Sequence, residues 1–364
     1  MNASLLIRAD ADAHIGTGHV MRCLGLAQAW QQDGGSVAFA VVRRIATPLE
    51  ERLRADACGV HSLEALPGSN EDAVQTVWLA RELRSAAVVL DGYEFDADYQ
   101  RCLKAAGLRV LCIDDNGHAT HYAADWVLNQ NIHANPALYP SREPYTRLLL
   151  GTAYVLLRRE FARWRGWVRI IPPHVRRVLV ALGGGDAENV TLKVTQALQE
   201  LVGKRRDLSG IPAMEAQVVV GGANPHWQSL KAALQGRPGA IRLVRHVKDM
   251  PGMMAWADLA VTAGGSTCWE VAFLGLPSCV LVSAENQVAS VARLHGEGVA
   301  QSLGWASGCS ADRLIGALEG LVDDPDRRRD MSERGRSLVD GRGAERVVGM
   351  VREALSLERH GKGS

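Results

Sequence analysis

The sequence predicts an α/β protein made of two Rossmann-like domains, each built around a parallel β-sheet. Short apolar segments alternate with segments of helical periodicity in both halves of the chain, which favours parallel sheets covered by helices. A length of 364 residues suits two domains. Between the halves, Pro172-Pro173 excludes a continuing helix and suits a linker. We therefore expect an N-terminal domain over 1–170, a C-terminal domain over 175–340, and a final helix and tail over 341–364.

In the first half, polar residues follow several of the expected strands. Ligands of parallel α/β sheets bind at the carboxyl ends of the strands. The residues that fall at these ends, and that we expect to line one cleft, are Asp10, Asp91, Tyr93, Asp114 and Asn129. The expected strands are Leu5–Ile7, Ser36–Val42, Ala87–Leu90, Arg109–Ile113, Trp126–Leu128 and Leu148–Gly151, and the expected helices cover 20–27, 47–57, 71–85 and 96–107.

The second half repeats the same plan without a close sequence repeat. Its expected strands are Arg177–Leu182, Gln217–Val220, Ile241–Val244, Leu259–Thr262 and Ser278–Val282. Its expected helices cover Glu188–Val202, 249–256, Cys268–Leu274, a segment opened by Asn286 and Gln287, and then 310–321, 325–337 and 343–358.

Composition and charge argue against several classes of function. A formal net charge of +1 gives no reason to expect nucleic acid or an anionic membrane as a partner. The seven cysteines are scattered and contain no Cys-x-x-Cys pair, so we expect free thiols rather than a zinc site or a disulfide framework. The N-terminus lacks the pattern of a signal peptide, and no apolar stretch is long enough to span a membrane. We therefore expect a cytoplasmic protein.

The stretch IRADADAHIGTGHVMRCLGLA, from Ile7 to Ala27, carries the strongest candidate site. It begins as a strand and ends as a helix, and the connecting loop contains Gly16, Gly18 and His19. The glycines let the backbone bend and approach a ligand. The unpaired N–H groups of a helix start favour phosphate or another anion. Because histidine is the residue most often used for proton transfer in proteins, His19 is a candidate for that role.

Two alternatives remain open at this loop. Gly-x-Gly before a helix often marks only a tight turn, and the segment lacks the Gly-x-Gly-x-x-Gly pattern of a dinucleotide site. Asp10 and Asp12 either orient His19 or cap the loop.

A second candidate site follows the expected strand Leu259–Thr262. Gly264 and Gly265 expose backbone N–H groups there, and Ser266 and Thr267 add two hydroxyls. Together with the start of the next helix, these groups form a plausible cradle for a diphosphate.

Three further groups have both a functional and a structural interpretation. Glu270 either accepts hydrogen bonds from a ribose diol or caps its helix. Gly183-Gly184-Gly185-Asp186, with Asn189 in the following turn, either contacts a ligand or only joins a strand to a helix. His118 and His121 are three residues apart without a third metal ligand, which favours a surface loop.

The motifs, taken in order, resemble those of a known family. The stretch IRADADAHIGTGHVMRCLGLA is similar to the N-terminal signature of the UDP-2,4-diacetamido-2,4,6-trideoxy-β-L-altropyranose hydrolases of pseudaminic acid biosynthesis, commonly called PseG. The resemblance extends over nearly the whole chain. The other motifs that carry it are LDGY (90–93), IDD (113–115), LNQN (128–131), LLGTAYVLLRREF (149–161), GGGD (183–186), ADLAVTAGGSTCWEVAFLGLP (257–277) and AENQ (284–287).

This resemblance implies a GT-B-like fold of the MurG type, in which two Rossmann-like domains with parallel sheets face each other across a cleft. The C-terminal domain would bind UDP, with Gly264 to Thr267 at the diphosphate, Glu270 at the ribose and the backbone near Val247 at the uracil. The N-terminal domain would supply His19 as the catalytic residue. The remaining substrate-binding candidates are Gly16, Gly18, Tyr93, Asp186, Asn189, Asn286 and Gln287. The resemblance implies no metal and no cofactor, and we expect a monomer.

The function implied is hydrolysis of a UDP-sugar to UDP and free 2,4-diacetamido-2,4,6-trideoxy-L-altrose, by inverting attack of water at the anomeric carbon. One alternative is a GT-B glycosyltransferase that passes a UDP-amino sugar to a real acceptor. Another is a protein that binds the nucleotide sugar without reacting.

Overall fold

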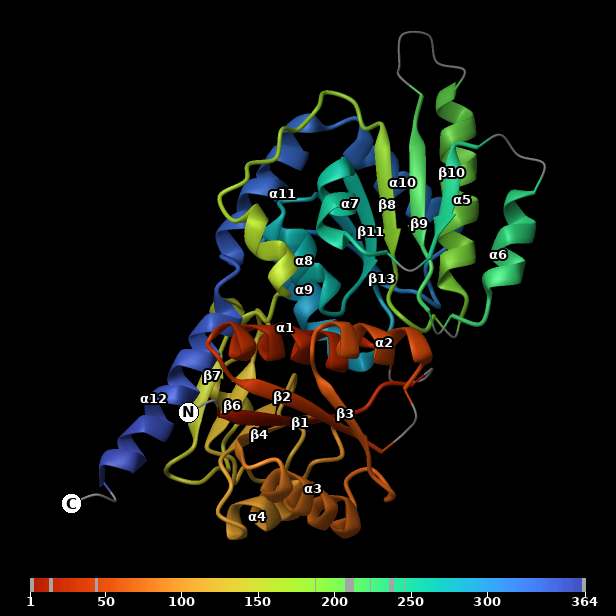
Figure 1. Ribbon diagram of the computed structural model, residues 1–364. Coiled ribbons are helices and arrows are strands. Elements are labelled where there is room, and N and C mark those ends of the chain that lie inside the picture. Colours follow the sequence, from red (N-terminus) through yellow and green to blue (C-terminus); the bar gives the residue numbers. More distant parts are fainter. Residues whose placement is uncertain are drawn as a thin grey trace. The chain divides into compact units, whose positions relative to one another are not determined.

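The computed structural model describes residues 3–12, 16–42, 45–186, 188–206, 213–222, 224–235, 239–245 and 247–361. The chain forms two compact units (Figure 1). Unit 1 comprises Met1–Arg159 together with Gly341–Ser364, and unit 2 comprises Glu160–Asp340.

Unit 1 is built around a seven-stranded sheet in which every neighbouring pair of strands is parallel. Its strands are β1 (Ser4–Ala9), β2 (Ser36–Val41), β3 (Gly59–Ser62), β4 (Ser85–Asp91), β5 (Val110–Ile113), β6 (Trp126–Asn129) and β7 (Arg147–Leu150). Its helices are α1 (Gly18–Gln32), α2 (Thr47–Ala55), α3 (Asn70–Glu82), α4 (Ala97–Ala105) and α12 (Gly343–Gly361), with short 3₁₀ turns η1 (Pro136–Leu138) and η2 (Thr152–Tyr154). The strand order is β3-β2-β1-β4-β5-β6-β7, so the winding reverses between β1 and β4, where sheets of this kind bind ligands.

Side-chain alternation along β1 explains why helices cover both faces of this sheet. Leu5 and Ile7 belong to the apolar core that contains Val20 and Leu24 of α1. Leu6, which points to the opposite face, belongs to the core that includes residues of α3 and α4. Figure 1 shows α1 and α2 on one face of the sheet and α3 and α4 on the other.

Unit 2 has a six-stranded parallel sheet with the order β10-β9-β8-β11-β12-β13. Its strands are β8 (Arg177–Ala181), β9 (Glu215–Val219), β10 (Ile241–Val244), β11 (Leu259–Ala263), β12 (Ser278–Val282) and β13 (Gln301–Trp305). Its helices are α5 (Val190–Arg206), α6 (Trp227–Leu234), α7 (Met250–Trp256), α8 (Thr267–Phe273), α9 (Val288–Gly296), α10 (Ala311–Val322) and α11 (Pro325–Leu338), with η4 (Glu285–Gln287) before α9 and η3 (Arg159–Trp164) at the junction.

The predicted fold class is confirmed, because both sheets are parallel and both are wound in the Rossmann manner. The elements that the sequence did not predict are mainly at sheet edges. β3 is a half-buried edge strand, and β13 carries polar residues and a glycine, so neither presents an apolar run. Helix α6 was also not predicted.

The junction between the units lies at Arg159 and Glu160, before the double proline. The segment that follows packs within unit 2, where the buried guanidinium of Arg169 donates to the backbone carbonyls of Leu274 (3.1 Å), Met254 (2.7 Å) and Ala257. Burial lowers the pKa of Arg169 to about 10. The Arg169 side chain thus donates hydrogen bonds to backbone carbonyls at the ends of α7 and α8. We expected Arg169 to belong to the N-terminal domain, but in the structure it stabilises unit 2.

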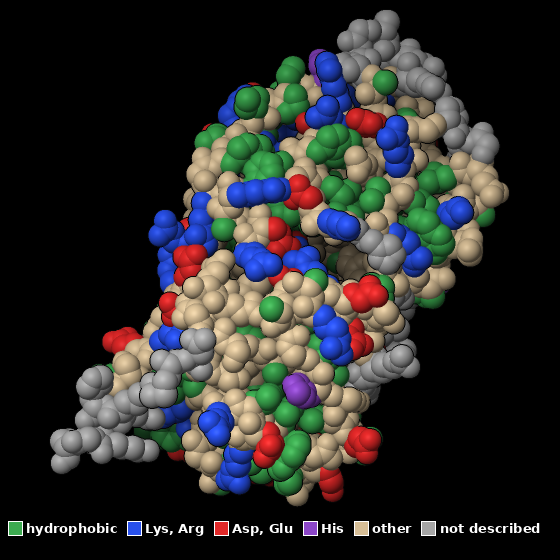
Figure 2. All heavy atoms as spheres, in the orientation of Figure 1, with side chains coloured by type: hydrophobic (Ala, Val, Ile, Leu, Met, Phe, Trp, Pro, Cys, Tyr) green, Lys and Arg blue, Asp and Glu red, His purple; other side chains and the backbone are tan. Residues whose placement is uncertain are grey.

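The exposed side chains show no strong preference for one charge. Acidic and basic residues are interspersed on the face drawn in Figure 2, in keeping with a formal net charge of +1. Among the described residues, no helix has both the length and the apolar character needed to cross a membrane.

Helix α12 returns the end of the chain to unit 1. Val347 and Val351 are buried in the same core as α1, and Arg352 forms an ion pair of 2.6 Å with Asp33. The guanidinium of Arg352 also lies 4.3 Å from the centre of the Trp30 ring. The last helix is therefore part of the unit 1 core rather than an appendage.

We expect Val347→Ala to lower the free energy of unfolding by about 2 kcal/mol, because it removes two buried methyl groups and leaves a cavity. Leu357→Ala is the matched control on the same helix, since that side chain is 64% exposed, and it should change stability by less than about 0.5 kcal/mol. Urea denaturation measures both values. Equal stability of the two variants would contradict the packing of α12 in the core.

Candidate functional site

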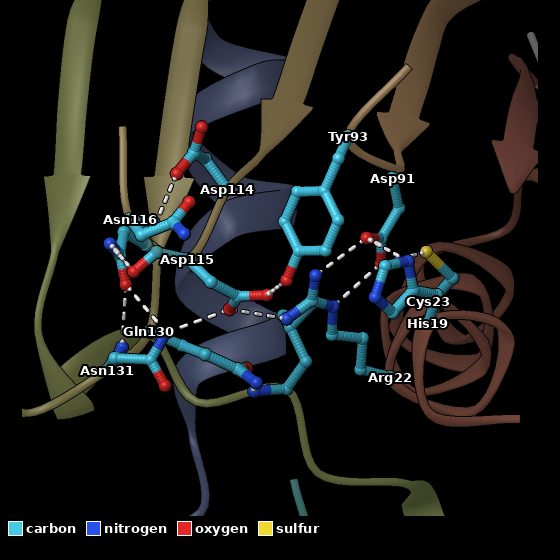
Figure 3. Close-up of polar contacts among 12 residues, drawn as sticks. His19, Arg22, Cys23, Asp91, Tyr93, Asp114, Asp115, Asn116, Gln130 and Asn131 are labelled. Carbon is cyan, nitrogen blue, oxygen red and sulfur yellow. Dashed lines mark hydrogen bonds and ion pairs between the residues drawn. The ribbon is translucent and has the colours of Figure 1, made fainter. Parts of the chain in front are cut away.

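The candidate site in unit 1 lies at the carboxyl edge of β4 and β5, beside the start of α1. Asp91 is the last residue of β4 and Asp115 follows β5, so adjacent parallel strands bring two carboxylates to one edge. Both carboxylates are buried. Helix α1 supplies the groups that face them, His19, Arg22 and Cys23 (Figure 3).

Arg22 joins the two carboxylates. Its Nε donates to Asp91 Oδ2 at 2.7 Å and its Nη2 donates to Asp91 Oδ1 at 2.6 Å, which makes a bidentate pair. Its Nη1 donates to Asp115 Oδ1 at 2.7 Å. Figure 3 shows the guanidinium between the two carboxylates. One buried cation therefore compensates two buried anions.

This arrangement keeps both carboxylates ionised. Burial alone would raise the pKa of Asp91, but the nearby charge of Arg22 outweighs it and holds that pKa below its ordinary value. The pKa of Asp115 is lowered for the same reason, with burial again outweighed by Arg22. Burial would lower the pKa of Arg22, yet the two carboxylates raise it. Burial also raises the pKa of Cys23, whose thiol donates to Asp91 Oδ2 at 3.2 Å and stays protonated.

His19 lies in the first turn of α1 with its ring beside Asp91. Its Nδ1 is 3.3 Å from Asp91 Oδ1, and the side chain is 14% exposed. A carboxylate that accepts from Nδ1 fixes the ring orientation and leaves Nε2 of the neutral ring as a proton acceptor. Gly16 adopts a φ of +76°, and its N–H donates to the carbonyl of Asp12 at 2.9 Å, which closes the loop before the helix. Gly18 opens the helix.

Tyr93 connects this pair to Asp115. Its hydroxyl donates to Asp115 Oδ2 at 2.9 Å, and its side chain is 41% exposed. Its ring meets the His19 ring nearly at right angles, with 5.6 Å between centroids. The five side chains of His19, Asp91, Arg22, Asp115 and Tyr93 thus form a closed circuit of contacts, which we call the His19 circuit.

Two asparagines, one at the end of β6 and one just after it, support the circuit through Asp115. Asn131 donates from its side-chain amide to Asp115 Oδ1 at 2.8 Å, and Asn129 donates to the Asp115 carbonyl at 2.9 Å. Both asparagines are buried. Their amides fix the loop that carries Asp115, so Asn129, which the sequence placed at a strand end, contributes to the edge as expected from topology.

The structure shows contacts of Asp10, Asp12 and Asp114, through the carboxylate in Asp10 and Asp114 and through the backbone carbonyl in Asp12. Asp10 pairs with the buried Arg8 at 2.7 Å and accepts from the Val42 N–H at 2.8 Å, so it joins the ends of β1 and β2. The backbone of Asp12 accepts the Gly16 N–H. Asp114 accepts from the N–H groups of Asn116 (2.7 Å) and Gly117 (2.6 Å), which folds the loop after β5.

In unit 2, the loop after β11 contains the predicted diphosphate cradle. The Gly264 N–H donates to the Leu281 carbonyl at 2.9 Å, and an added Cβ there would lie 2.5 Å from Val291 Cγ2. At Gly265 the nearest atom to such a Cβ is Gln287 Nε2, at 3.9 Å. Ser266 and Thr267 are half-buried at the start of α8. Packing therefore requires glycine at Gly264, whereas Gly265 has room beside it.

The other predicted residues of unit 2 occupy the same carboxyl edge of its sheet. Glu270 is half-buried in the first turn of α8, and Asn286 is half-buried in η4. Gln287 accepts the Ser283 N–H at 2.9 Å through Oε1 and so has a structural role next to Gly264. Val247 is half-buried between β10 and α7.

Asp186 and Asn189 both adopt left-handed backbone angles, with φ of 59° and 53°. The Asp186 carboxylate accepts from the N–H groups of Val190 (2.7 Å) and Thr191 (2.9 Å) and therefore caps α5. It also accepts from the Asn224 side-chain amide at 3.3 Å. Oδ1 of Asn189 is buried without a hydrogen-bond partner among the described residues. In the described structure the Asp186 carboxylate thus serves the join between β8 and α5, in keeping with the strand-to-helix interpretation of this segment.

Sequence reasoning missed Arg22 and the position of His118. Arginine is a residue type that is normally exposed, whereas Arg22 is buried on α1. Its only signal in the sequence was its place within the motif from Ile7 to Ala27. His118 lies beside Tyr93, with ring centroids 5.4 Å apart, rather than on an open surface loop. Among the described residues, no group of three or more His, Cys, Asp or Glu side chains is arranged to hold a metal ion.

Comparison with known proteins identifies the class to which this architecture belongs. Residues 178–341, which include most of unit 2, match the family model of the glycosyltransferase family 28 C-terminal domain. The structure is similar to the crystal structure of Acinetobacter baumannii MurG, with a TM-score of 0.61 and 17% identity over 96% of this chain and 99% of that chain. The chain therefore has the GT-B fold, and its residues 178–341 are similar to the glycosyltransferase family 28 C-terminal domain.

Two named relatives share parts of both units. The spore coat polysaccharide biosynthesis protein SpsG of Bacillus subtilis is 28% identical over 249 residues, which cover 68% of this chain and 70% of the relative. The UDP-2,4-diacetamido-2,4,6-trideoxy-beta-L-altropyranose hydrolase of Campylobacter jejuni is 27% identical over 201 residues, which cover 53% of this chain and 65% of the relative. The similarity to the second protein agrees with the resemblance seen in the motifs.

We expect Arg22→Met to destabilise unit 1 by about 3–5 kcal/mol at about pH 8, because it leaves Asp91 and Asp115 buried without their cation. One carboxylate of the variant then takes up a proton on folding, so its folded pKa rises above the unfolded value. Stability from such a group is present at low pH and is lost as the pH rises through the folded pKa. The difference in free energy of unfolding between wild type and the variant should therefore be smaller at about pH 5 than at about pH 8. Urea denaturation at the two pH values measures this difference.

Arg329→Met is the matched control, because Arg329 pairs with Asp326 where the side chains are 51% and 85% exposed. Its effect should stay below about 1 kcal/mol at each pH. If Arg22→Met lowers the free energy of unfolding only slightly, or by the same amount at both pH values, the role assigned to this guanidinium is contradicted.

Proposed function

We propose that this protein hydrolyses the nucleotide sugar UDP-2,4-diacetamido-2,4,6-trideoxy-β-L-altropyranose to UDP and free 2,4-diacetamido-2,4,6-trideoxy-L-altrose. The observation that carries the proposal is the contact between His19 and Asp91 at the start of α1, in a chain whose residues 178–341 match the family model of the glycosyltransferase family 28 C-terminal domain. The similarity to the Campylobacter jejuni hydrolase supports the choice of substrate and reaction. All seven cysteines are free thiols, which suits a reducing compartment such as the cytoplasm.

In this proposal, unit 2 binds the UDP portion of the substrate. The backbone N–H groups and hydroxyls of the loop from Gly264 to Thr267 would contact the diphosphate. Glu270 would accept hydrogen bonds from the ribose, and the backbone near Val247 would contact the uracil. Asn286, which is half-buried at the same sheet edge, would contact the sugar. Gln287 and Asp186 would contribute mainly because their side chains accept hydrogen bonds from backbone N–H groups and so fix the loops at the site.

Unit 1 would supply the base. Neutral His19 takes a proton from a water molecule at Nε2, while Asp91 accepts at Nδ1 and stabilises the imidazolium that forms. The water oxygen bonds to the anomeric carbon as the bond from that carbon to the phosphate oxygen breaks, and the configuration inverts. Base catalysis of this kind contributes on the order of 10²–10⁴ in rate. Because Arg22 keeps Asp91 ionised, the carboxylate does not compete for the proton.

The leaving group is UDP, and negative charge develops on its phosphate oxygen as the bond breaks. Donors fixed in the loop after β11 would stabilise this charge without reorganising, which is the main contribution of such sites. Tyr93, whose hydroxyl is held by Asp115, would border the sugar next to His19.

A second candidate function is transfer of the sugar to an acceptor other than water. The observation that favours it is the match of unit 2 to a glycosyltransferase domain. Incubation of the purified protein with the UDP-sugar in the absence of any acceptor separates the two functions. Stoichiometric release of UDP and free sugar supports the hydrolase, whereas an intact donor that is consumed only when an acceptor is added supports the transferase.

We expect His19→Asn to lower kcat by about 10²–10⁴-fold and to leave the affinity for UDP unchanged, since UDP is proposed to bind unit 2. UDP release followed by ³¹P NMR and calorimetric titration with UDP measure the two quantities. His61→Asn, on the edge strand β3 of the same unit, is the control and should keep full activity. Full turnover by the His19 variant would remove His19 from the mechanism.

We expect Gly265→Ala to fold normally, because the nearest atom to the new Cβ lies 3.9 Å away, and to bind UDP at least about tenfold more weakly. The methyl group would occupy the space through which the diphosphate approaches the backbone N–H groups. Gly203→Ala, on helix α5 with no described atom within 4 Å of its Cβ, is the control. Unchanged UDP affinity of the Gly265 variant would place the diphosphate elsewhere.

A further inference from the structure

His118 lies beside the His19 circuit, and neither the motifs nor the proposed reaction explains its role. It follows β5 on the loop that begins at Asp114, and its side chain is only 12% exposed. Its Nδ1 lies 2.6 Å from Asp114 Oδ2 in an ion-pair contact. Its Nε2 is buried without a hydrogen-bond partner among the described residues. A buried imidazole with this contact is not a feature of an ordinary surface loop.

Asp114 holds His118 by both backbone and side chain. Its Oδ2 accepts from the His118 N–H at 3.3 Å and from the Tyr122 hydroxyl at 2.5 Å, in addition to the contact with the imidazole. Its Oδ1 accepts from the backbone N–H groups of Asn116 and Gly117. The carboxylate is fully buried. The loop is therefore folded around one anion, and the ring of His118 has little freedom to move.

The fixed ring of His118 packs against Tyr93. The two ring planes meet at 77° with 5.4 Å between centroids, which is an edge-to-face contact. Tyr93 makes a second contact of the same kind with His19, at 86° and 5.6 Å. The hydroxyl bond to Asp115 fixes only the far end of the Tyr93 side chain. Because Tyr93 is half-exposed, the ring contacts with His118 and His19 help to hold its side chain in one orientation.

We propose that His118 is a positioning residue, which acts through Tyr93 to hold His19 in its reactive orientation. This inference rests on the proposed function only for its kinetic consequence. The contacts that carry it belong to unit 1 alone and do not depend on the identity of the substrate. His118 does not touch the reacting atoms, because its Nε2 is buried within the protein.

The first test observes His19 directly, without substrate. The Cε1–H resonances of the histidine rings are recorded by ¹H–¹³C NMR at one pH, and His19→Asn assigns the His19 signal among the eleven histidines. His118→Asn should shift the His19 signal. His121→Asn should leave the signal in place, because His121 is on the same loop but contacts Glu143 at 3.2 Å and Ser141 at 2.9 Å. An unmoved His19 signal in the His118 variant would overturn the proposal.

The second test is kinetic. His118→Asn should lower kcat about tenfold with KM unchanged, since it misplaces the base without removing a substrate contact. His118→Phe retains an aromatic ring against Tyr93 and should restore most of kcat. His121→Asn should match wild type, with thermal denaturation confirming that all three variants are folded. Loss of kcat in His118→Phe equal to that in His118→Asn would contradict positioning through the ring.

A double-mutant cycle shows whether the effect passes through Tyr93. In a Tyr93→Ala background, His118→Asn should cause little further loss of kcat, because the ring through which it acts is absent. Full additivity would show that His118 acts by another route and would overturn the proposal. If wild type does not hydrolyse the UDP-sugar at all, the proposed function fails, while the NMR comparison still decides whether His118 positions His19.

Discussion

The buried guanidinium of Arg22 is the interaction on which the candidate site depends. Parallel strands β4 and β5 bring Asp91 and Asp115 to the same edge, where two buried carboxylates without a cation would have to share a proton. Arginine suits this position because its planar fork reaches both groups, with two bonds to Asp91 and one to Asp115. Arg22 therefore favours the ionised form of Asp91, the partner of His19, which suits His19 to the proposed role of a base.

Helix α1 supplies the imidazole, the guanidinium and the thiol of the site from one face. Arg22 and Cys23 follow His19 by three and four positions, so the three side chains project from the same side of the helix toward Asp91. Val20 and Leu24 are completely buried in the unit 1 core. Packing of the apolar residues thus sets the rotation of the helix, and that rotation directs the imidazole and the guanidinium to the strand end. The spacing within GHVMRC is a structural requirement as well as a motif.

Local patterns in the sequence were sufficient for the fold and for about half of the unit 1 site. Alternating apolar runs predicted the parallel sheets, and the glycine loop predicted the place of His19. Arg22 could not be predicted, since its burial depends on two carboxylates 69 and 93 positions away. His118 was assigned to a surface loop because nothing in the local sequence shows that Asp114 folds the loop inward. Non-local electrostatics, rather than periodicity, determined the residues that were missed.

Two adjacent glycines in unit 2 show how packing and ligand binding can be separated. Gly264 is required by the protein itself, since a Cβ would come within 2.5 Å of Val291. Gly265 has no such neighbour, and its φ does not lie in the left-handed region. Neither backbone conformation nor internal packing therefore explains glycine at that position. In the proposed function, the missing Cβ at Gly265 lets an anionic group come close to a backbone N–H at the end of β11.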